Sequence, residues 1–430
     1  MRTMKAILHR SELKGEVEAP PSKSYTHRAI AVASLSACSC EIERPLICED
    51  TKATIRAAKA IGAEVEYDAR RMRVEGVERL RTPDDVIYAA NSGTTLRFFT
   101  AICSLCEGAA VLTGDASLRR RTNKPLLKAL NDLGAEAFST KGDGTAPLVV
   151  RGRLRGGETE IDGSVSSQFA SALLIACPRC ENDSRIAVRN AVSVPYMRMT
   201  LEVLRAASAE IPFICEANDF IFEISGGQAY NLRHFKVPGD FSSASYILAA
   251  AVLTGSSVAV RNLEPSEQGD VKILEILREM GAEVSWNKEA GVVHVRDSGK
   301  LEGISVDLRE NPDLAPTVAV LGAFAEGRTE IKGVGHLRHK ETDRISTLAT
   351  ELRKLGVSAE EREDGLLISS SGAKAAAVKL DAHGDHRLAM ALCVAALRTG
   401  GEVSGVESVS ISYPEFFEHL AALGADFELK

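Results

Sequence analysis

Short runs of hydroxyl, amide and basic side chains recur directly before apolar stretches of the chain. They read PSKSYTHR (21–28), NSGTTLR (91–97), SVSSQ (164–168) and GDHR (384–387). Such an opening is typical of a buried helix, whose first turn offers backbone N–H groups and the positive end of the helix dipole to an anion. Lys and Arg beside that end are repelled by the dipole, which indicates an anion between cation and helix. The alternative for the Ser, Asn and Asp residues, Ser166 included, is that they only cap the helices.

The candidate anion-binding residues lie in these runs and in the loops after the predicted strands. They are Lys23, Ser24, Arg28, Asn91, Gly93, Thr94, Arg97, Arg119, Arg120, Arg121, Ser166, Ser167, Gln168, Lys340, Arg344, His386 and Arg387. Two carboxylates, Asp313 before an apolar run and Glu341 in HKETDR, stand among these cations. A carboxylate inside a cationic site is a candidate acid or base. Taken alone, each has a simpler explanation, a helix cap for Asp313 and a surface salt bridge for Glu341.

The polar runs recur because the chain repeats one unit. A helical pattern ending in a phrase like LGAEV occurs six times. The position of the glycine in that phrase falls at residues 62, 134, 208, 281, 356 and 424, in steps of 72, 74, 73, 75 and 68. Five of these positions are glycine, a signal for the C-terminal end of a helix. Each copy also contains a nearly all-apolar helix, typical of burial, and a short alternating strand. The repetition predicts an α/β fold of two domains, each with three units whose buried helices are surrounded by sheets.

Composition excludes several classes of protein. The chain has 430 residues, which favours two domains, and its 45% apolar and 26% charged content is that of a soluble globular protein. A formal net charge of −7 argues against general binding to nucleic acid or membrane surfaces. No apolar run is long enough to span a bilayer, and the first residues lack the apolar core of a signal peptide. Nine cysteines, an odd number, suit a reducing cytoplasm.

Two other functional classes are less favoured. HLRH (336–339), HGDH (383–386), CSLC (103–106) and CPRC (177–180) have metal-ligand spacing. The cysteine pairs fall near the ends of buried helices, so we interpret them as core or loop thiols, and the histidines belong to the anion site. A non-catalytic repeat scaffold does not account for carboxylates and cations gathered at equivalent repeat positions. No phosphate loop or dinucleotide fingerprint occurs, so neither ATP nor a dinucleotide is indicated.

Seven motifs resemble those of the 5-enolpyruvylshikimate-3-phosphate synthases, and the resemblance spans the whole chain. They are PSKSYTHRA, NSGTTLR, GSVSSQFASALL, PDLAPT, KETDRI, TELRKLG and GDHRLAM. The resemblance implies an inside-out α/β barrel in each domain. It implies a discontinuous first domain of residues 1–19 and 238–430, a second domain of 20–237 and an active site in the cleft between them. The implied reaction transfers the enolpyruvyl group of phosphoenolpyruvate to the 5-hydroxyl of shikimate 3-phosphate and releases phosphate, the sixth step of the shikimate pathway to aromatic amino acids.

The resemblance also implies roles for individual residues. Asp313 takes the 5-hydroxyl proton, Glu341 with Lys23 delivers a proton to C3, and a tetrahedral intermediate then expels phosphate. The residues implied to hold shikimate 3-phosphate are Lys23, Ser24, Arg28, Ser166, Ser167, Gln168, Ser193, Tyr196, Asp313, His336 and Lys340. Those implied to hold phosphoenolpyruvate are Lys23, Asn91, Gly93, Arg121, Gln168, Arg344, His386 and Arg387. No metal or cofactor is implied, and we expect a cytoplasmic monomer.

Three positions depart from the pattern of the family. Thr122 stands where Pro usually follows the arginine, and His336 where Asn is frequent. Ile411 replaces a Lys that contacts phosphoenolpyruvate, and we expect Arg119, Arg120 or His339 to substitute in part. The nearest rival class, the UDP-N-acetylglucosamine enolpyruvyltransferases, usually has a Cys in the loop that reads TGDASLRRRTNKP here and a Lys-Asn pair near the start. This chain has neither, so the sequence favours the shikimate reaction.

Overall fold

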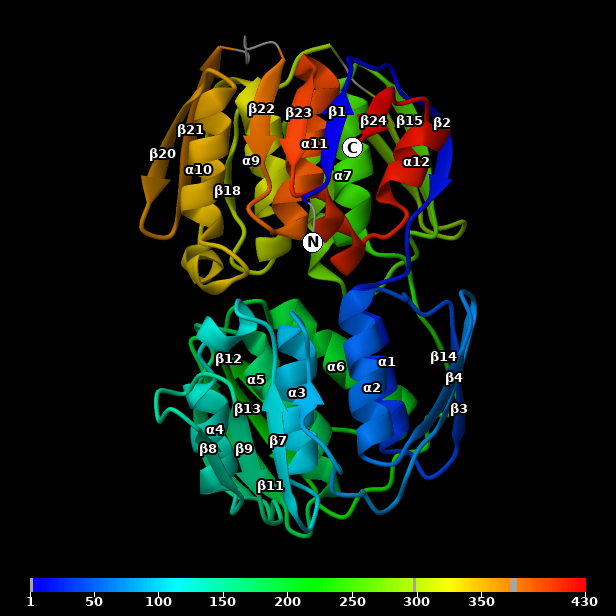
Figure 1. Ribbon diagram of the computed structural model, residues 1–430, viewed down its shortest axis with the longest axis vertical. Coiled ribbons are helices and arrows are strands. Elements are labelled where there is room, and N and C mark those ends of the chain that lie inside the picture. Colours follow the sequence, from blue (N-terminus) through cyan, green and yellow to red (C-terminus); the bar gives the residue numbers. More distant parts are fainter. Residues whose placement is uncertain (1–2, 297–298, 372–376) are drawn as a thin grey trace. The chain divides into compact units, whose positions relative to one another are not determined.

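The computed structural model describes residues 3–296, 299–371 and 377–430, which form two compact units. Unit 1 comprises Met1–Pro20 and Pro238–Lys430, and unit 2 comprises Pro21–Val237. In each unit helices lie inside and strands lie on the outside (Figure 1).

Unit 2 contains twelve of the described strands and six of the described α-helices. The helices are α1 (Lys23–Ser34), α2 (Glu49–Ala60), α3 (Gly93–Cys103), α4 (Lys124–Asp132), α5 (Ser167–Ala176) and α6 (Val194–Ala206), with the 3-10 helices η1 (Leu118–Arg120) and η2 (Cys177–Arg179). The strands are β3 (Ser39–Glu43), β4 (Glu64–Tyr67), β5 (Arg71–Glu75), β6 (Ile87–Tyr88), β7 (Ala109–Thr113), β8 (Glu136–Ser139), β9 (Leu148–Arg151), β10 (Gly157–Asp162), β11 (Ser184–Arg189), β12 (Phe213–Glu216), β13 (Asp219–Ile224) and β14 (His234–Lys236).

Unit 1 has the same make-up in its described residues. Its helices are α7 (Phe241–Leu253), α8 (Ile273–Glu279), α9 (Ala315–Phe324), α10 (Arg344–Lys354), α11 (His386–Thr399) and α12 (Phe416–Ala422), with the 3-10 helices η3 (Gly269–Lys272), η4 (Pro312–Leu314), η5 (Gly335–His339) and η6 (Val406–Ile411). Its strands are β1 (Lys5–Leu8), β2 (Lys14–Glu18), β15 (Ser257–Arg261), β16 (Glu283–Asn287), β17 (Val292–Arg296), β18 (Ser305–Asp307), β19 (Glu326–Lys332), β20 (Ser358–Arg362), β21 (Gly365–Ser371), β22 (Val378–Asp381), β23 (Gly401–Ser404) and β24 (Phe427–Leu429).

The described strands form six four-stranded sheets with one shared topology. Their orders are β14-β3-β5-β4, β6-β7-β9-β8 and β10-β11-β13-β12 in unit 2, and β2-β15-β17-β16, β18-β19-β21-β20 and β22-β23-β1-β24 in unit 1. In every sheet the first pair is parallel and the next two pairs are antiparallel. The predicted six-fold α/β repeat is therefore confirmed.

A buried helix links the two parallel strands of four sheets: α3, α5, α9 and α11 play this role. The remaining two sheets exchange a strand at the two crossings of the chain. β2 precedes α1 but pairs with β15 in unit 1, whereas β14 precedes α7 but pairs with β3 in unit 2. This exchange explains why unit 1 is built from both ends of the sequence.

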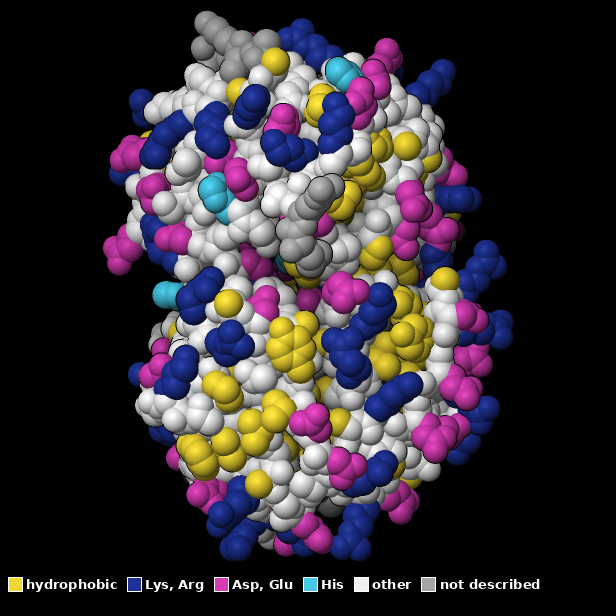
Figure 2. All heavy atoms as spheres, viewed as in Figure 1, with side chains coloured by type: hydrophobic (Ala, Val, Ile, Leu, Met, Phe, Trp, Pro, Cys, Tyr) yellow, Lys and Arg dark blue, Asp and Glu magenta, His cyan; other side chains and the backbone are white. Residues whose placement is uncertain are grey.

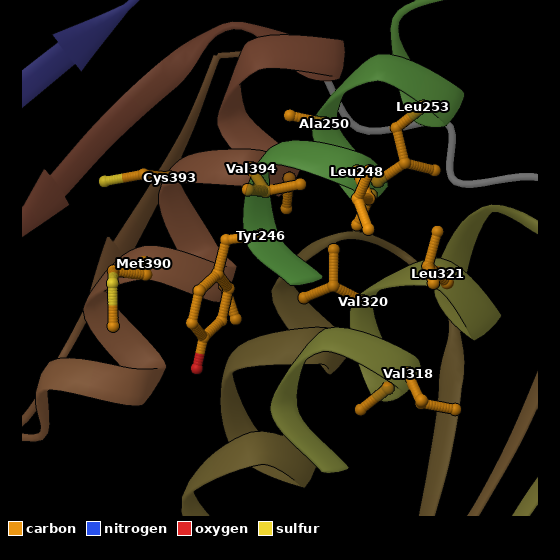
Figure 3. Packing of buried hydrophobic residues seen from close by; sticks show 14 of the residues in the cluster. Tyr246, Leu248, Ala250, Leu253, Val318, Val320, Leu321, Met390, Cys393 and Val394 are labelled. Carbon is orange, nitrogen blue, oxygen red and sulfur yellow. The ribbon is translucent and has the colours of Figure 1, made fainter. Parts of the chain in front are cut away.

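The two kinds of helix follow from the repeated sequence pattern. All residues of α7 are buried, and Figure 3 shows its side chains packed against those of α9 and α11. The amphipathic helices end at the positions expected from the repeat, where residues 62, 134, 208, 281, 356 and 424 all have positive φ. Glycine adopts this left-handed backbone without strain, and of these six positions Ser208 is the one that adopts it with a side chain.

The surface of each unit carries mixed charge. Figure 2 shows basic and acidic side chains interspersed over the visible surface, in keeping with a formal net charge of −7. In the described part of the chain no helix combines the length and hydrophobicity that a bilayer crossing requires. Across the same residues no group of three or more His, Cys, Asp or Glu is arranged to hold a metal ion. Both cysteine pairs are buried as unbridged thiols.

Candidate active site

Three buried helices of unit 2 begin at the polar runs seen in the sequence. The hydroxyls of Ser22, Ser92 and Ser166 accept hydrogen bonds from backbone N–H groups of the first turns of α1, α3 and α5. These serines are therefore N-caps, as the simpler interpretation of the sequence holds. Ser166 has a second role, because Nη1 of Arg97 also donates to its Oγ at 3.2 Å. Capping and the assembly of a polar site are thus combined in one residue.

A cluster of polar groups surrounds the start of α3, and we call it the unit 2 cluster. It consists of Asn91, Gly93, Arg97, Arg121, Ser166 and Gln168. Arg97 donates to Oε1 of Gln168 at 2.7 Å, and Arg121 donates to Oδ1 of Asn91 at 3.2 Å. A Cβ on Gly93 would lie 3.4 Å from Gln168, 3.5 Å from Arg121 and 3.7 Å from Arg97. The helix N-terminus and two guanidinium groups therefore converge where Gly93 leaves room, an arrangement suited to an anion.

Lys23 and Arg28 extend the polar surface along α1. Lys23 lies in the first turn and pairs with Asp50 of α2 at 2.8 Å, with both side chains mostly buried. Arg28 is buried and donates to Thr200 Oγ1 at 2.8 Å and to the carbonyls of Ser24 and Tyr196 at 2.9 and 2.7 Å. Burial lowers the pKa of Arg28 to about 10, an effect that the nearby Tyr196 and Tyr25 partly oppose. These three bonds use three of its five N–H groups, which leaves two for a ligand.

A chain of hydroxyl contacts ties α1 and α2 to the unit 2 cluster. Nδ1 of His27 lies 2.6 Å from the hydroxyl of Thr54, which lies 2.7 Å from that of Thr95, which in turn donates to Ser92 at 2.7 Å. Burial, reinforced by Lys23 and Arg28, holds the pKa of His27 well below its usual range, so the imidazole is neutral. The chain of contacts fixes the spacing of the helix starts that carry Lys23 and Gly93.

Unit 1 holds a second cluster built around one buried arginine, and we call it the unit 1 cluster. It consists of Asp313, Glu341, Arg344, Asp385 and Arg387. Arg344, the first residue of α10, donates to Asp385 at 2.7 and 3.2 Å, to Glu341 at 2.7 Å and to Asp313 at 3.3 Å. Burial alone lowers the pKa of Arg344, but the carboxylates of Asp385, Glu341 and Asp313 outweigh it and hold that pKa above its ordinary value. Four of its five N–H groups are thus committed to protein carboxylates.

Asp313 and Asp385 occupy different positions in this cluster. Asp385 caps α11, accepts the N–H of Arg387 at 2.9 Å and is fully buried, so it holds Arg344 and the helix start together. Asp313 lies in η4, where one oxygen accepts from Arg344 and the other from Nη2 of Arg387 at 2.6 Å. Its side chain is 18% exposed. Asp313 is therefore the carboxylate of the two that a ligand can reach.

The remaining predicted residues of unit 1 flank this cluster. His336 lies in η5, and its buried Nε2 has no hydrogen-bond partner within the described residues. Burial, with Lys340, lowers the pKa of His336 to about 3, partly opposed by Asp313. The neutral ring can both donate and accept, which suits a substrate hydroxyl as well as the Asn frequent in the family. His386 is the buried first residue of α11, and Lys340 follows η5 half-buried.

Other predicted residues have less direct support. Ser193 precedes α6 in a left-handed backbone conformation (φ 57°), and its side chain makes no cap bond, whereas Tyr196 lies in the first turn of that helix beside Arg28. Arg119 and Arg120 are exposed and donate to carbonyls of their own loop, at Gly114 and Ala116. They therefore do not join the unit 2 cluster.

Sequence reasoning missed the partners that hold these groups in place. Asp50, which pairs with Lys23, and Asp270, which accepts a hydrogen bond from Ser242 of α7, were not predicted. A signal was present, because both open the amphipathic helix of their repeat, directly after the loop that follows a strand. Thr122 stands where the family usually has Pro, and its contact to the site is made by the backbone. Its carbonyl accepts a hydrogen bond from Arg97 at 3.4 Å, which the carbonyl of a proline could accept equally well.

The fold and these clusters define the chain as an enolpyruvyl transferase. Its structure resembles that of an EPSP synthase from Acinetobacter baumannii, with a TM-score of 0.84, 29% identity and complete coverage of both chains. It also shares its fold with the enolpyruvyl transferase NikO of Streptomyces tendae, at a TM-score of 0.79 and 19% identity over 100% of this chain and 99% of that one.

The chain belongs to the EPSP synthase (3-phosphoshikimate 1-carboxyvinyltransferase) family, whose sequence model matches residues 7–420. A relative named 3-phosphoshikimate 1-carboxyvinyltransferase from Methanothrix thermoacetophila is 54% identical over 97% of both chains. A second relative of that name, from Methanocella arvoryzae, is 51% identical over 99% of this chain and 100% of its own.

Proposed function

We propose that this chain transfers the enolpyruvyl group of phosphoenolpyruvate to the 5-hydroxyl of shikimate 3-phosphate and releases phosphate. The observation that carries the proposal is that Asp313 accepts hydrogen bonds from Arg344, at the start of the amphipathic helix α10, and from Arg387, in the first turn of the buried helix α11. A partly exposed carboxylate between two cations is suited to accept a proton where anions bind. The membership of the chain in the EPSP synthase family supports the same reaction. One chain carries all the implied residues, so we propose that it acts as a monomer in the cytoplasm.

Binding of phosphoenolpyruvate would free Asp313, the proposed base, from Arg344 and Arg387. The carboxylate of phosphoenolpyruvate is a ligand that guanidinium groups bind bidentately. In the protein alone, Asp313 takes that place on Arg344 and Arg387. When the donor carboxylate takes over these N–H groups, an oxygen of Asp313 becomes available to the 5-hydroxyl. The base is therefore active only when the donor is present, which limits unproductive proton transfer.

The unit 2 residues supply the remaining anion contacts. The phosphate of the donor fits the unit 2 cluster, where Arg121, Gln168 and the α3 N-terminus converge. Shikimate 3-phosphate fits Ser24, Arg28, Ser166, Ser167 and Tyr196, with Lys23 shared by both substrates. Asp313 removes the proton as oxygen attacks C2, and Glu341 with Lys23 delivers a proton to C3. The tetrahedral intermediate then expels phosphate as the enol ether forms, and no metal is required.

The activity is tested by measuring phosphate release from purified protein. We expect phosphate only when phosphoenolpyruvate and shikimate 3-phosphate are both present, and we expect a chelator to leave the rate unchanged. The control replaces shikimate 3-phosphate by UDP-N-acetylglucosamine. Equal phosphate release with that acceptor would assign the chain to the UDP-N-acetylglucosamine enolpyruvyltransferases. The relatives named 3-phosphoshikimate 1-carboxyvinyltransferase argue against that assignment.

Ile411 gives a prediction about the donor site. It ends η6, which packs against α11, the helix that carries His386 and Arg387. Arg119 and Arg120 each donate to a carbonyl of their own loop, and His339 is exposed, so we expect substitution by these cations to be partial and Ile411→Lys to lower the KM for phosphoenolpyruvate. One charge-assisted contact corresponds to about ten- to a hundred-fold in affinity. Ile411→Met, of similar length but neutral, is the control. An unchanged KM in the lysine variant would place residue 411 outside the donor site or show that another cation already serves it.

A further inference from the structure

Asp270 is a buried carboxyl group that the proposed reaction does not use. It lies in η3, and one oxygen accepts a hydrogen bond from the hydroxyl of Ser242 in the first turn of α7. The other oxygen is buried and has no hydrogen-bond partner within the described residues. A buried carboxylate with half of its acceptors unused is costly, so the position calls for an explanation.

The repeat supplies an internal comparison. Asp50 in unit 2 and Asp270 in unit 1 each open the amphipathic helix of their repeat and face the first turn of a buried helix. Asp50 meets Lys23 there, at 2.8 Å, which stabilises its charge. Asp270 meets the hydroxyl of Ser242 instead. The same carboxyl position is therefore paired with a cation in unit 2 and with a neutral group in unit 1.

Charged groups of the unit 1 cluster face Asp270 from neighbouring elements. They are Asp313 of η4 and Arg387 of α11, joined by Asp240, which is the N-cap of α7 and lies outside that cluster. Tyr246 lies one turn beyond Ser242 in α7. Figure 3 shows its hydroxyl pointing away from Leu248 and Leu253 of the same helix. Burial raises the pKa of this hydroxyl to about 12, and Arg387 opposes that effect. Burial, then Asp313 and Asp240, raise the pKa of Asp270 to about 7, against the opposing effects of Ser242 and Arg387.

We propose that Asp270 is a positioning residue whose carboxyl, anchored by Ser242 behind the unit 1 cluster, controls whether Arg387 is directed at Asp313 and the donor or is withdrawn from them. The proposal rests on the proposed function, because it takes phosphoenolpyruvate as the ligand of Arg387. Neutral Asp270 leaves the guanidinium to Asp313 and to the donor carboxylate. Ionised Asp270 competes for the same guanidinium, since a third carboxylate then faces it. Asp270 would thus adjust donor affinity near neutral pH.

The test is the pH dependence of the KM for phosphoenolpyruvate, measured from pH 5.5 to 8.5 in wild type and three variants. In wild type the KM is expected to rise about tenfold as pH increases through the pKa of Asp270, the loss of one charge-assisted contact. Asp270→Asn, which mimics the neutral carboxyl, should keep the low-pH KM at high pH. Ser242→Ala removes the donor to the ionised carboxylate, so the rise should move to higher pH. Ser245→Ala, a buried serine of α7 that bonds Thr317 instead, should titrate like wild type.

The outcomes separate this inference from the proposed function. If wild type releases no phosphate at any pH, the proposed function fails. If wild type is active and Asp270→Asn shows the same rise in KM, the role of Asp270 is wrong. A carboxyl signal present in wild type and missing in Asp270→Asn, followed by infrared difference spectroscopy without substrates, gives the titration of Asp270 directly. A midpoint near the ordinary pKa of aspartate would also overturn the inference, and thermal melts of each variant confirm that it is folded.

Discussion

Asp313→Asn is expected to lower the turnover number by about 10²–10⁴-fold, the contribution of a positioned general base. Asparagine has nearly the shape of aspartate, and its amide oxygen can still accept from Arg344 or Arg387. The cluster should therefore stay assembled while the proton acceptor is lost. The KM for shikimate 3-phosphate should change far less than turnover, because the acceptor is held mainly by residues of unit 2. Steady-state kinetics with both substrates varied measures the two effects separately.

Asp307→Asn is the matched control for this experiment. Asp307 is also an aspartate of unit 1 beside an arginine, but its side chain is 52% exposed and its partner Arg309 lies at 3.5 Å. That variant should keep wild-type turnover. A turnover number in Asp313→Asn within a few-fold of wild type would remove Asp313 from the proton transfer, and Glu341 would be the next candidate.

The fold was predictable because its signals are local and occur six times. In the sequence a buried helix appears as an uninterrupted apolar run, and the end of an amphipathic helix appears as a glycine. The structure gives these glycines, such as Gly62 and Gly281, a positive φ. One coincidence in a single copy carries little weight, whereas a constant step through the chain identifies the repeat. The exchange of β2 and β14 between sheets was not predictable, since the pairing of β2 with β15 and of β14 with β3 joins segments far apart in the sequence and leaves no mark on either strand.

The site was predictable to the extent that its residues lie at helix starts. Lys23, Gly93, Arg344 and His386 are each the first residue of a helix, so the polar runs revealed them. Their partners come from other segments: Asp385 holds Arg344 from 41 residues away. Pairings of that kind depend on how helices pack, which the order of residues in one run does not encode.

Arg344→Met is expected to destabilise the protein strongly. Arg344 is buried and bonded to Asp313, Glu341 and Asp385, so its removal takes a cation from all three carboxylates, of which Asp313 keeps its pairing with Arg387. Breaking a buried ion pair by removing one partner costs about 3–5 kcal/mol. For a unit of this size that corresponds to a fall in melting temperature of roughly 10 °C. Calorimetry of wild type and variant measures it.

The loss should depend on pH in a defined direction. Without Arg344, the folded variant keeps buried carboxylates that have lost a cation, and protonating them removes that cost. A folded-state pKa above the unfolded value gives stability that is complete at low pH and is lost as pH rises. The difference in melting temperature between wild type and variant should therefore be larger at pH 8 than at pH 5. Arg309→Met, which removes an exposed partner, should shift the melt little at either pH.

A second substitution distinguishes charge from packing as the cause. Asp385 is the most buried of the three carboxylates, so adding Asp385→Asn to Arg344→Met removes the unpaired charge that costs most. Asparagine can still accept the N–H groups that begin α11, which keeps the helix cap. If unpaired charge is the cause, the double variant melts above Arg344→Met at pH 8 and the gap narrows at pH 5. If lost packing of the arginine side chain is the cause, the double variant melts no higher than the single one at either pH.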